Sequence, residues 1–329
     1  MQSYTIMNLY PLFFTPLFKY RLWGGTKLRT VLHKEFDGDH IGESWEVSGV
    51  AGSETIVSNG PLAGKTLNEL IASYGADFLG KTVIDKFGSH FPLLIKFLDT
   101  EKPLSVQVHP GDAIAKARHD SYGKNEMWYI MDAEPDAEII VGFENDTKPE
   151  DYTKAVSEGS LIDLLHKENV SKGDIIHIPA GRIHAIGAGI MLAEIQQTSD
   201  VTYRVYDYDR VDAKTGKKRD LHTEQATDVL DYNGCECYKT PYKAKLNTSV
   251  PVIEDHYFTT AVLDLEGELL RDYSHQDSFT ILMCVAGSTS FMYDDKTYDF
   301  KQGQTVVLPA KVDTVQFISA RATILEVTV

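Results

Sequence analysis

The sequence is poor in positive charge and in long apolar segments. Its 32 lysines and arginines stand against 48 acidic residues, which gives a formal net charge of −16. Nucleic acids and anionic membranes are bound through clustered basic residues, so this charge opposes both kinds of partner. No stretch approaches the roughly 20 apolar residues of a membrane-spanning helix. We therefore expect neither a nucleic acid nor a membrane as a partner, and any phosphorylated ligand requires a local basic cluster.

Cysteine is also scarce. Cys235, Cys237 and Cys284 leave an odd thiol, which is typical of proteins in a reducing compartment, so we expect a cytoplasmic protein. Cys235 and Cys237 lack the second pair or nearby histidine of a common zinc site, and we interpret them as ordinary thiols. The uncharged segment at residues 2–18 has no basic start and contains two prolines, so we interpret it as a buried strand rather than a signal peptide.

The distribution of apolar residues predicts a mainly β protein. Short segments rich in β-branched and aromatic residues recur along the chain, separated by glycine, proline and aspartate. Helical periodicity is confined to three stretches, which we expect to be insertions in a β-scaffold. These stretches lie at residues 62–80, 111–120 and 148–168.

Two β-rich blocks follow one another. A polar stretch at residues 212–223 separates them, and we predict domains at residues 1–230 and 231–329, with the helical insertions in the first. The blocks share a weak repeat, GDIIHIPAGRIH around Pro179 and GQTVVLPAKVDT around Pro309. Both copies have glycine, five residues and then Pro-Ala. We therefore expect two copies of one module, each a jelly roll or barrel.

The segment at residues 173–184 resembles the second signature motif of the cupins, small β-barrels that hold a metal near the barrel mouth. The motif reads Gly-x5-Pro-x-Gly-x2-His and ends at His184. Cupins take their other ligands from an earlier hairpin, and the matching segments here are LSVQVHPGD and GKNEMWYI. They supply Gln107, His109 and Glu126. Alternation along a strand places Gln107 and His109 on one face together with Ser105.

Two imidazoles, one carboxylate and one amide oxygen match a mixed nitrogen and oxygen site for zinc with a position open for substrate. Other divalent first-row metals fit these ligands too. His177, on the strand that enters the Pro179 turn, is an alternative ligand, but it falls outside the cupin pattern. We interpret it as a core residue or as a support for a ligand.

The second module lacks these ligands, so we predict that it binds no metal. Aligning KNEMWYIMDAE with DSFTILMCVAG places Phe279 opposite Glu126, and the Pro-Ala turn places Thr314 opposite His184. His275 is the residue near that hairpin that would be able to restore a ligand.

The separation of His109 from Glu126, 17 positions, exceeds the few residues found in ordinary cupins and indicates an insertion. This arrangement resembles the type I mannose-6-phosphate isomerases, in their short bacterial form. The resemblance extends across most of the chain through five motifs in order: GESWEVSG at residues 42–49, FPLLIKFLDTEKPLSVQVHP, GKNEMWYI, IPAGRIHAIG and EIQQTSDVTYRVYDYDR. It implies an aldose-ketose isomerase that interconverts mannose 6-phosphate and fructose 6-phosphate. It also implies one zinc per chain on Gln107, His109, Glu126 and His184, and an active-site arginine at Arg204.

Such a reaction moves a proton between neighbouring carbons through an enediol and needs a fixed positive charge and a general base. Lys124, Asp200 and a metal-bound water are all plausible bases, and the sequence does not choose among them. Ser105, Lys96 and Arg204 are candidates to hold the phosphate. The alternative for the two lysines is a solvated surface amine, and for Arg204 a surface salt bridge with Asp207 or Asp209.

Three other functions remain open at this point. A sugar-binding cupin without catalysis would have no need of Arg204 or of a base. A metal-dependent oxygenase also uses two histidines and one carboxylate, and oxygen uptake would distinguish it. A cupin-type glucose-6-phosphate isomerase would act on an epimeric sugar. The sequence does not indicate an oligomeric state.

Overall fold

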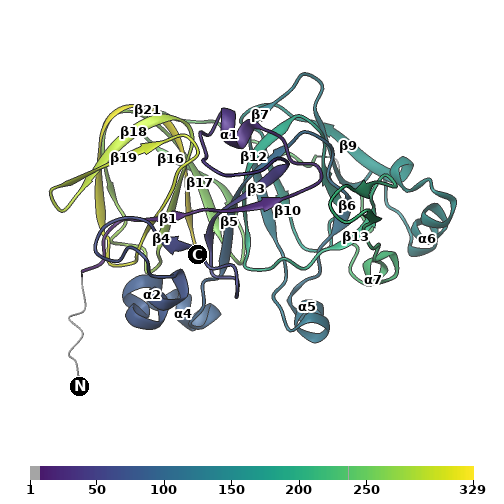
Figure 1. Ribbon diagram of the computed structural model, residues 1–329, viewed down its shortest axis with the longest axis horizontal. Coiled ribbons are helices and arrows are strands. Elements are labelled where there is room, and N and C mark those ends of the chain that lie inside the picture. The colour runs from purple at the N-terminus through teal and green to yellow at the C-terminus, as the bar shows by residue number, and fades with distance from the viewer. Residues whose placement is uncertain (1–7, 236) are drawn as a thin grey trace. The chain divides into compact units, whose positions relative to one another are not determined.

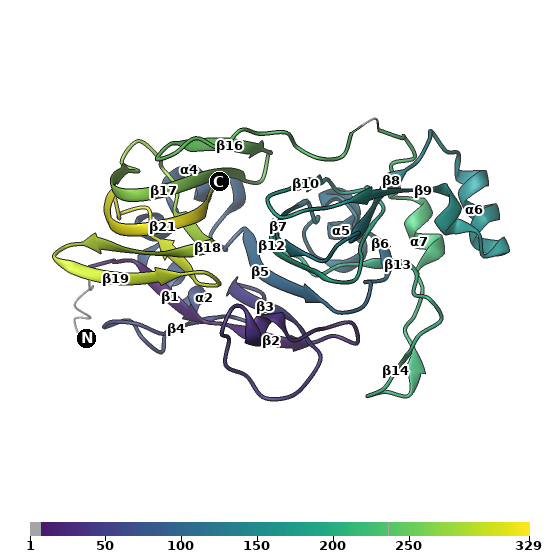
Figure 2. The same ribbon diagram turned by 90° about the horizontal axis from the view of Figure 1, so that it is seen from above.

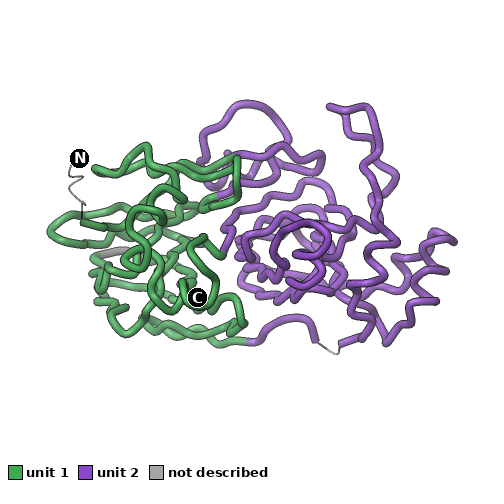
Figure 3. The backbone as a smooth tube through the Cα atoms, turned by 90° about the horizontal axis from the view of Figure 1, so that it is seen from below, with its two compact units in different colours: residues 1–17, 46–92, 242–329 green, residues 18–45, 93–241 purple. Residues whose placement is uncertain are grey.

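The structure is a computed structural model that describes residues 8–235 and 237–329. These residues are mainly β, as predicted, and form 21 strands and several short helices (Figure 1). Two compact units can be distinguished, each formed by segments that are separated along the chain (Figure 3). Unit 1 comprises residues 1–17, 46–92 and 242–329, and unit 2 comprises residues 18–45 and 93–241. No helix within the described part of the chain is long and apolar enough to cross a membrane.

Unit 2 is a barrel of two antiparallel sheets. The larger sheet has the order β10 (Ile175–Ile178), β7 (Glu126–Ala133), β12 (Ile190–Gln197), β5 (Leu93–Thr100), β3 (Ile41–Ser48) and β2 (Leu17–Tyr20). The smaller has the order β13 (Tyr203–Tyr206), β6 (Val106–Val108), β11 (His184–Ile186), β8 (Glu138–Phe143) and β9 (Leu165–Asn169). Trp128, Leu192 and Ile176 from the first sheet and Val141 and Ile186 from the second share one buried cluster, so the sheets pack face to face.

Helices cover the outer face of the smaller sheet. These are α6 (Pro149–Glu158), η1 (Leu161–Leu164) and α7 (Thr223–Thr227), and Figures 1 and 2 both show α6 beside β9 and α7 beside β13. Tyr152 and Leu161 pack there against Val106 and Val108. α5 (Asp112–His119) lies between β6 and β7, where the 111–120 insertion is predicted, and the short α1 (Lys27–Thr30) and the hairpin β14 (Val211–Asp212) and β15 (Lys217–Lys218) complete the unit.

The helix predicted over residues 148–168 is shorter than expected. Gly159 ends α6 in a left-handed conformation, with φ of 71°, a conformation that favours glycine. Residues 165–169 then form the edge strand β9 instead of continuing the helix, and Glu138 pairs with Asn169 across β8 and β9.

Unit 1 is a second barrel. Its sheet has the order β16 (Ser249–Glu254), β17 (Thr259–Asp272), β21 (Thr314–Thr328), β18 (Thr280–Tyr293), β20 (Thr305–Leu308), β1 (Leu12–Thr15) and β4 (Ile56–Val57), with β19 (Lys296–Lys301) paired to β18. Its interior is a buried cluster that includes Leu263, Leu282, Phe291 and Ile324. Of the strand expected at residues 2–18, β1 is present, and residues 2–7 lie outside the described part.

The helical insertion predicted at residues 62–80 appears as α2 (Leu67–Tyr74) and α3 (Ala76–Leu79), followed by α4 (Lys81–Phe87). These helices belong to unit 1 together with residues 242–329. The Phe279 N–H donates to Leu79 O at 3.1 Å and the Ala310 N–H to Phe78 O at 2.9 Å, and the Asp277 carboxylate accepts the first N–H groups of α4. The compact units are therefore not contiguous, whereas the division into domains at 1–230 and 231–329 stays a prediction.

Candidate metal centre

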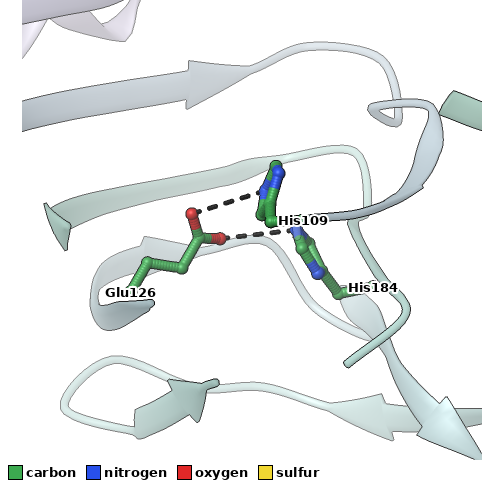
Figure 4. A group of neighbouring side chains, drawn as sticks. All are labelled: His109, Glu126 and His184. Atoms are coloured by element: carbon green, nitrogen blue, oxygen red, sulfur yellow. Dashed lines mark ion pairs between the residues drawn. The ribbon is translucent and has the colours of Figure 1, made fainter. Parts of the chain in front are cut away.

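Three buried side chains converge inside the barrel of unit 2. His109 follows β6, Glu126 begins β7 and His184 begins β11, and each is 1% exposed. Figure 4 shows the Glu126 carboxylate turned toward both imidazoles. Its Oε2 lies 3.6 Å from His109 Nε2 and its Oε1 lies 3.4 Å from His184 Nε2. One ligand atom from each of the three residues lies within 4.8 Å of the others, so the group is able to hold a metal ion.

Backbone carbonyls fix the orientation of both imidazoles. His109 Nδ1 donates to Val201 O at 2.9 Å, and His184 Nδ1 donates to Arg182 O at 2.8 Å. Each ring therefore carries its proton on Nδ1 and turns the lone pair of Nε2 inward, which is the usual arrangement of metal-binding histidines. Burial lowers the pKa of His184 to about 3 and that of His109 well below its ordinary value, with Lys124 adding to the second effect. Both rings are neutral at neutral pH, as metal ligands must be.

The side chain of Lys124 lies among the acceptor atoms of this cluster. Lys124 Nζ donates to His109 Nε2 at 3.1 Å and forms an ion pair with the Glu126 carboxylate. Burial raises the pKa of Glu126 to about 7, although Lys124 opposes this change. Lys124 is buried, which excludes the solvated surface amine considered from the sequence. The chemistry of the donor set therefore fits a cation.

Gln107 and Arg204 lie on neighbouring strands beside this cluster. The Gln107 side-chain amide is 3.3 Å from His184 Nε2, measured from its Nε2. Arg204 is paired with Gln107 across β13 and β6, and its Nε donates to Ser105 Oγ at 3.2 Å. Burial and the neighbouring Arg219 lower the pKa of Arg204 to about 10, so it keeps its charge at neutral pH.

The expected alternative for Arg204, a salt bridge with Asp207 or Asp209, is wrong. Asp207 is ion-paired with Arg210 and Arg219, at 2.6 and 2.5 Å, and Asp209 with Lys218 at 2.6 Å. The Arg204 guanidinium instead donates to Ser105 and to the backbone oxygen of Asp220.

Lys96 is also buried, in a chain of charges that the sequence did not reveal. Its Nζ donates to Glu194 Oε1 at 2.7 Å and to Gln196 Oε1 at 2.6 Å. Glu43 lies nearby and accepts from Arg21 Nε at 2.7 Å and Nη2 at 2.9 Å. Burial disfavours the Lys96 ammonium, but Glu194 and Glu43 more than compensate and raise its pKa.

Glu43 and Glu194 are the site residues that the sequence analysis missed. Glu43 lies in β3 and Glu194 in β12, and every residue of these two strands is buried. A carboxylate in a strand that is predicted to be buried indicates a cationic partner nearby, because a buried charge without a partner is energetically costly.

Two further candidates lie apart from the buried cluster. Asp200 is exposed, although the neighbouring Val201 contacts His109 through its backbone. His177 is paired with Met127 in the sheet, while Ile176 and Ile178 on either side of it face the barrel interior. Alternation therefore turns His177 to the other face of the sheet.

The strand register of unit 1 corrects the expected alignment of the two modules. Ile178, just before Pro179, pairs with Glu126, and Leu308, just before Pro309, pairs with Thr280. Thr280 rather than Phe279 thus occupies the position of Glu126, because a shift of one residue exchanges the two faces of a strand.

A second correction concerns the position of His184. Thr314 is exposed, and the next residue, Val315, belongs to the barrel interior. Val315 pairs with Arg271, as His184 pairs with Gln107. The turn after Pro309 is therefore one residue longer than the turn after Pro179.

An internal ion pair occupies the corresponding region of the second barrel. Glu326 pairs with Leu282 in the sheet, as Glu194 pairs with Trp128. The Glu326 carboxylate accepts from Arg271 Nε and Nη2, both at 2.9 Å, and from the Tyr273 hydroxyl at 2.6 Å. A guanidinium thus neutralises the buried carboxylate, and Tyr273 and Val315 add no imidazole.

The fold and the site define a cupin of two β-modules, one of which carries a buried His–Glu–His cluster suited to a metal. Comparison with known proteins agrees with this class. Residues 12–146 match the model of the phosphomannose isomerase type I catalytic domain, and residues 248–328 match that of the mannose-6-phosphate isomerase cupin domain.

The relatives identify the family. The mannose-6-phosphate isomerase ManA of Bacillus subtilis is 37% identical over 306 residues, covering 92% of this chain and 94% of the relative. The mannose-6-phosphate isomerase of Streptococcus mutans is 35% identical, covering 93% and 95%. A crystal structure of the Bacillus subtilis mannose 6-phosphate isomerase superposes with a TM-score of 0.88 at 32% identity, covering 97% of this chain and 99% of that one. The chain belongs to the type I mannose-6-phosphate isomerase family.

Proposed function

We propose that the protein is a zinc-dependent aldose-ketose isomerase that interconverts mannose 6-phosphate and fructose 6-phosphate through an enediol. The observation that carries the proposal is the buried cluster of His109, Glu126 and His184, with the cationic side chains of Lys124 and Arg204 beside it. The names of the relatives support the choice of sugar. A cytoplasmic location is part of the proposal, and the three free cysteines agree with it.

One zinc ion per chain is proposed on His109, Glu126 and His184, with Gln107 as a fourth ligand. Two imidazole nitrogens and a carboxylate oxygen are typical of catalytic zinc sites, which keep one position for substrate. When bound, zinc would supply a Lewis acid that stabilises negative charge on the sugar oxygens.

The reaction needs a group that removes a proton from the carbon beside the carbonyl and returns it to the neighbouring carbon. Lys124 is better placed for this task than Asp200, because its Nζ lies among the cluster atoms, whereas the Asp200 side chain is exposed. We infer that the unprotonated amine of Lys124 takes up the proton at Nζ and that the resulting ammonium returns it to the neighbouring carbon. Asp200 stays the alternative prediction.

The surrounding residues bind the substrate and stabilise charge. Arg204 keeps a permanent positive charge close to Gln107 and stabilises the oxygen anion that develops as the enediol forms. Ser105 and Lys96 hold the phosphate or hydroxyl oxygens. Because Lys96 is already paired with Glu194, it contributes directed hydrogen bonds rather than an unbalanced charge.

A coupled assay with each hexose 6-phosphate, run on purified, chelator-stripped and zinc-reloaded protein, tests the proposal. We expect turnover of mannose 6-phosphate that disappears on stripping and returns with zinc. Preference for glucose 6-phosphate would overturn the choice of sugar. Metal-dependent oxygen uptake would indicate an oxygenase, and sugar binding without turnover a non-catalytic cupin.

A further inference from the structure

Arg204 is held by a segment that lies outside the motifs of the metal site. β13 is the edge strand of the smaller sheet, with β6 on one side. On its other side the Arg204 N–H donates to His222 Nδ1 at 3.2 Å, and the His222 N–H donates to Arg204 O at 2.7 Å. Both backbone groups of Arg204 therefore find partners in one residue, which takes the place of a neighbouring strand.

The rest of this segment is anchored as well. The Asp220 backbone oxygen accepts from Arg204 Nη1 at 3.1 Å. Arg219 donates to the Asp207 carboxylate through Nε at 2.8 Å and Nη2 at 2.5 Å. Residues 219–222 thus contact the backbone and the guanidinium of Arg204 and are tied back to the end of β13.

The contact requires a particular form of His222. Only an unprotonated Nδ1 accepts a hydrogen bond from a peptide N–H, so the ring is neutral with its proton on Nε2. The charged or titratable groups around it are Arg204, Asp220 and His119, and the Tyr203 ring lies 6.2 Å away. Burial and then the positive charge of Arg204 lower the pKa of His222, which favours the neutral ring at neutral pH.

We propose that His222 is a positioning residue for the reaction: its neutral imidazole fixes the backbone of Arg204 and thereby directs the guanidinium toward Ser105 and the reacting sugar. This inference rests on the function proposed above. It gives the loop after the β14–β15 hairpin a role in turnover, in which His222 acts through Arg204.

Three substitutions distinguish the effect of the Nδ1 acceptor from the effect of the size of the ring. His222→Asn keeps an acceptor at the position of Nδ1, and His222→Phe keeps the ring but removes the acceptor. His119→Phe is the matched control, because His119 Nε2 bonds the Tyr203 hydroxyl at 2.8 Å, one residue from Arg204. We expect His222→Phe to lower kcat roughly tenfold with little change in KM, since an unmade hydrogen bond at a partly buried amide typically has an effect of this size. His222→Asn and His119→Phe should stay within about twofold of the wild type.

The results that overturn the proposal are distinct. Wild-type turnover in His222→Phe, or equal losses in His222→Phe and His222→Asn, would refute a role for the acceptor, and an equal loss in His119→Phe would point to general packing. Zinc content and the unfolding midpoint of each variant identify misfolding.

Hydrogen exchange of the Arg204 amide, followed by NMR, tests the contact independently of activity. The exchange should be faster in His222→Phe than in His222→Asn. If the wild type turns over no hexose phosphate while this exchange difference appears, the proposed function fails and the positioning contact stands; equal exchange refutes the contact itself.

Discussion

Replacing Glu43 with glutamine tests whether the buried charges beside the metal site stabilise unit 2. Glu43 is buried, accepts two hydrogen bonds from Arg21 and accepts a third from Trp45 Nε1 at 2.7 Å. Burial opposes its ionisation, but Arg21 and then Lys96 lower the pKa of Glu43 from 4.5 to about 2. At about 1.4 kcal/mol for each pH unit, this difference corresponds to about 3 kcal/mol of folding free energy at pH 7.

The pH dependence follows from the direction of the change. Because the folded-state pKa lies below the unfolded value, the contribution is fully present above about pH 4.5 and is lost as the pH falls toward 2. The destabilisation caused by Glu43→Gln should therefore be about 3 kcal/mol at pH 7 and less than about half as large at pH 3.

Tryptophan fluorescence in urea is the appropriate assay, because Trp23, Trp45 and Trp128, the three tryptophans of the chain, all belong to unit 2. Metal-free samples remove the effect of metal loss in acid. Glu138→Gln is the control, since Glu138 forms a half-exposed pair with Lys167 at 3.0 Å, and such pairs contribute less than about 1 kcal/mol. Equal effects of the two substitutions, or a Glu43→Gln effect that does not change with pH, would refute the reasoning.

Three further outcomes are expected. His184→Ala should abolish metal binding and turnover together, while His177→Ala, on the other face of its sheet, should leave the metal content of about one per chain unchanged; elemental analysis checks both. Arg204→Ala should lower kcat on the order of a hundredfold and Arg204→Lys should restore it in part, whereas a change in KM alone would make Arg204 a phosphate ligand. Residues 242–329 should contribute no metal site, so a metal bound near Arg271 and Glu326 in a crystal of the zinc-loaded protein would contradict the register described above.

The sequence was sufficient to predict the fold class from local patterns, and the residues of the cluster from the resemblance of its motifs to those of the cupins. Alternation along β6 placed Gln107 and Ser105 on one face, and the glycine and proline of the Pro179 turn marked His184. The start of α6 follows from proline at its first position. These features need no knowledge of which strands become neighbours.

Features that depend on which strands pair could not be predicted from the sequence. The role of Glu194 as the partner of Lys96 becomes apparent only from the pairing of β12 with β5, which places the two residues opposite each other. The Phe279 alignment failed because it is offset by one residue, which exchanges the two faces of a strand, and the Thr314 alignment failed because the turn after Pro309 is one residue longer. The grouping of α2 to α4 with residues 242–329 involves contacts between distant residues, such as the hydrogen bond between Leu79 and Phe279, 200 positions apart, which no local pattern predicts.

The Arg271–Glu326 pair opposes the introduction of the metal ligands of the first barrel at the corresponding positions of the second. Arg271, Tyr273, Thr280 and Val315 stand where the first barrel carries Gln107, His109, Glu126 and His184. Substituting Arg271 alone leaves the Glu326 carboxylate in the interior without its cation, and removing one partner of a buried pair typically costs about 3–5 kcal/mol. Any stepwise introduction of a metal ligand set that begins at Arg271 therefore passes through such a destabilised protein. Protein stability alone therefore disfavours a metal ligand at the position of Arg271, independently of any selection on the reaction.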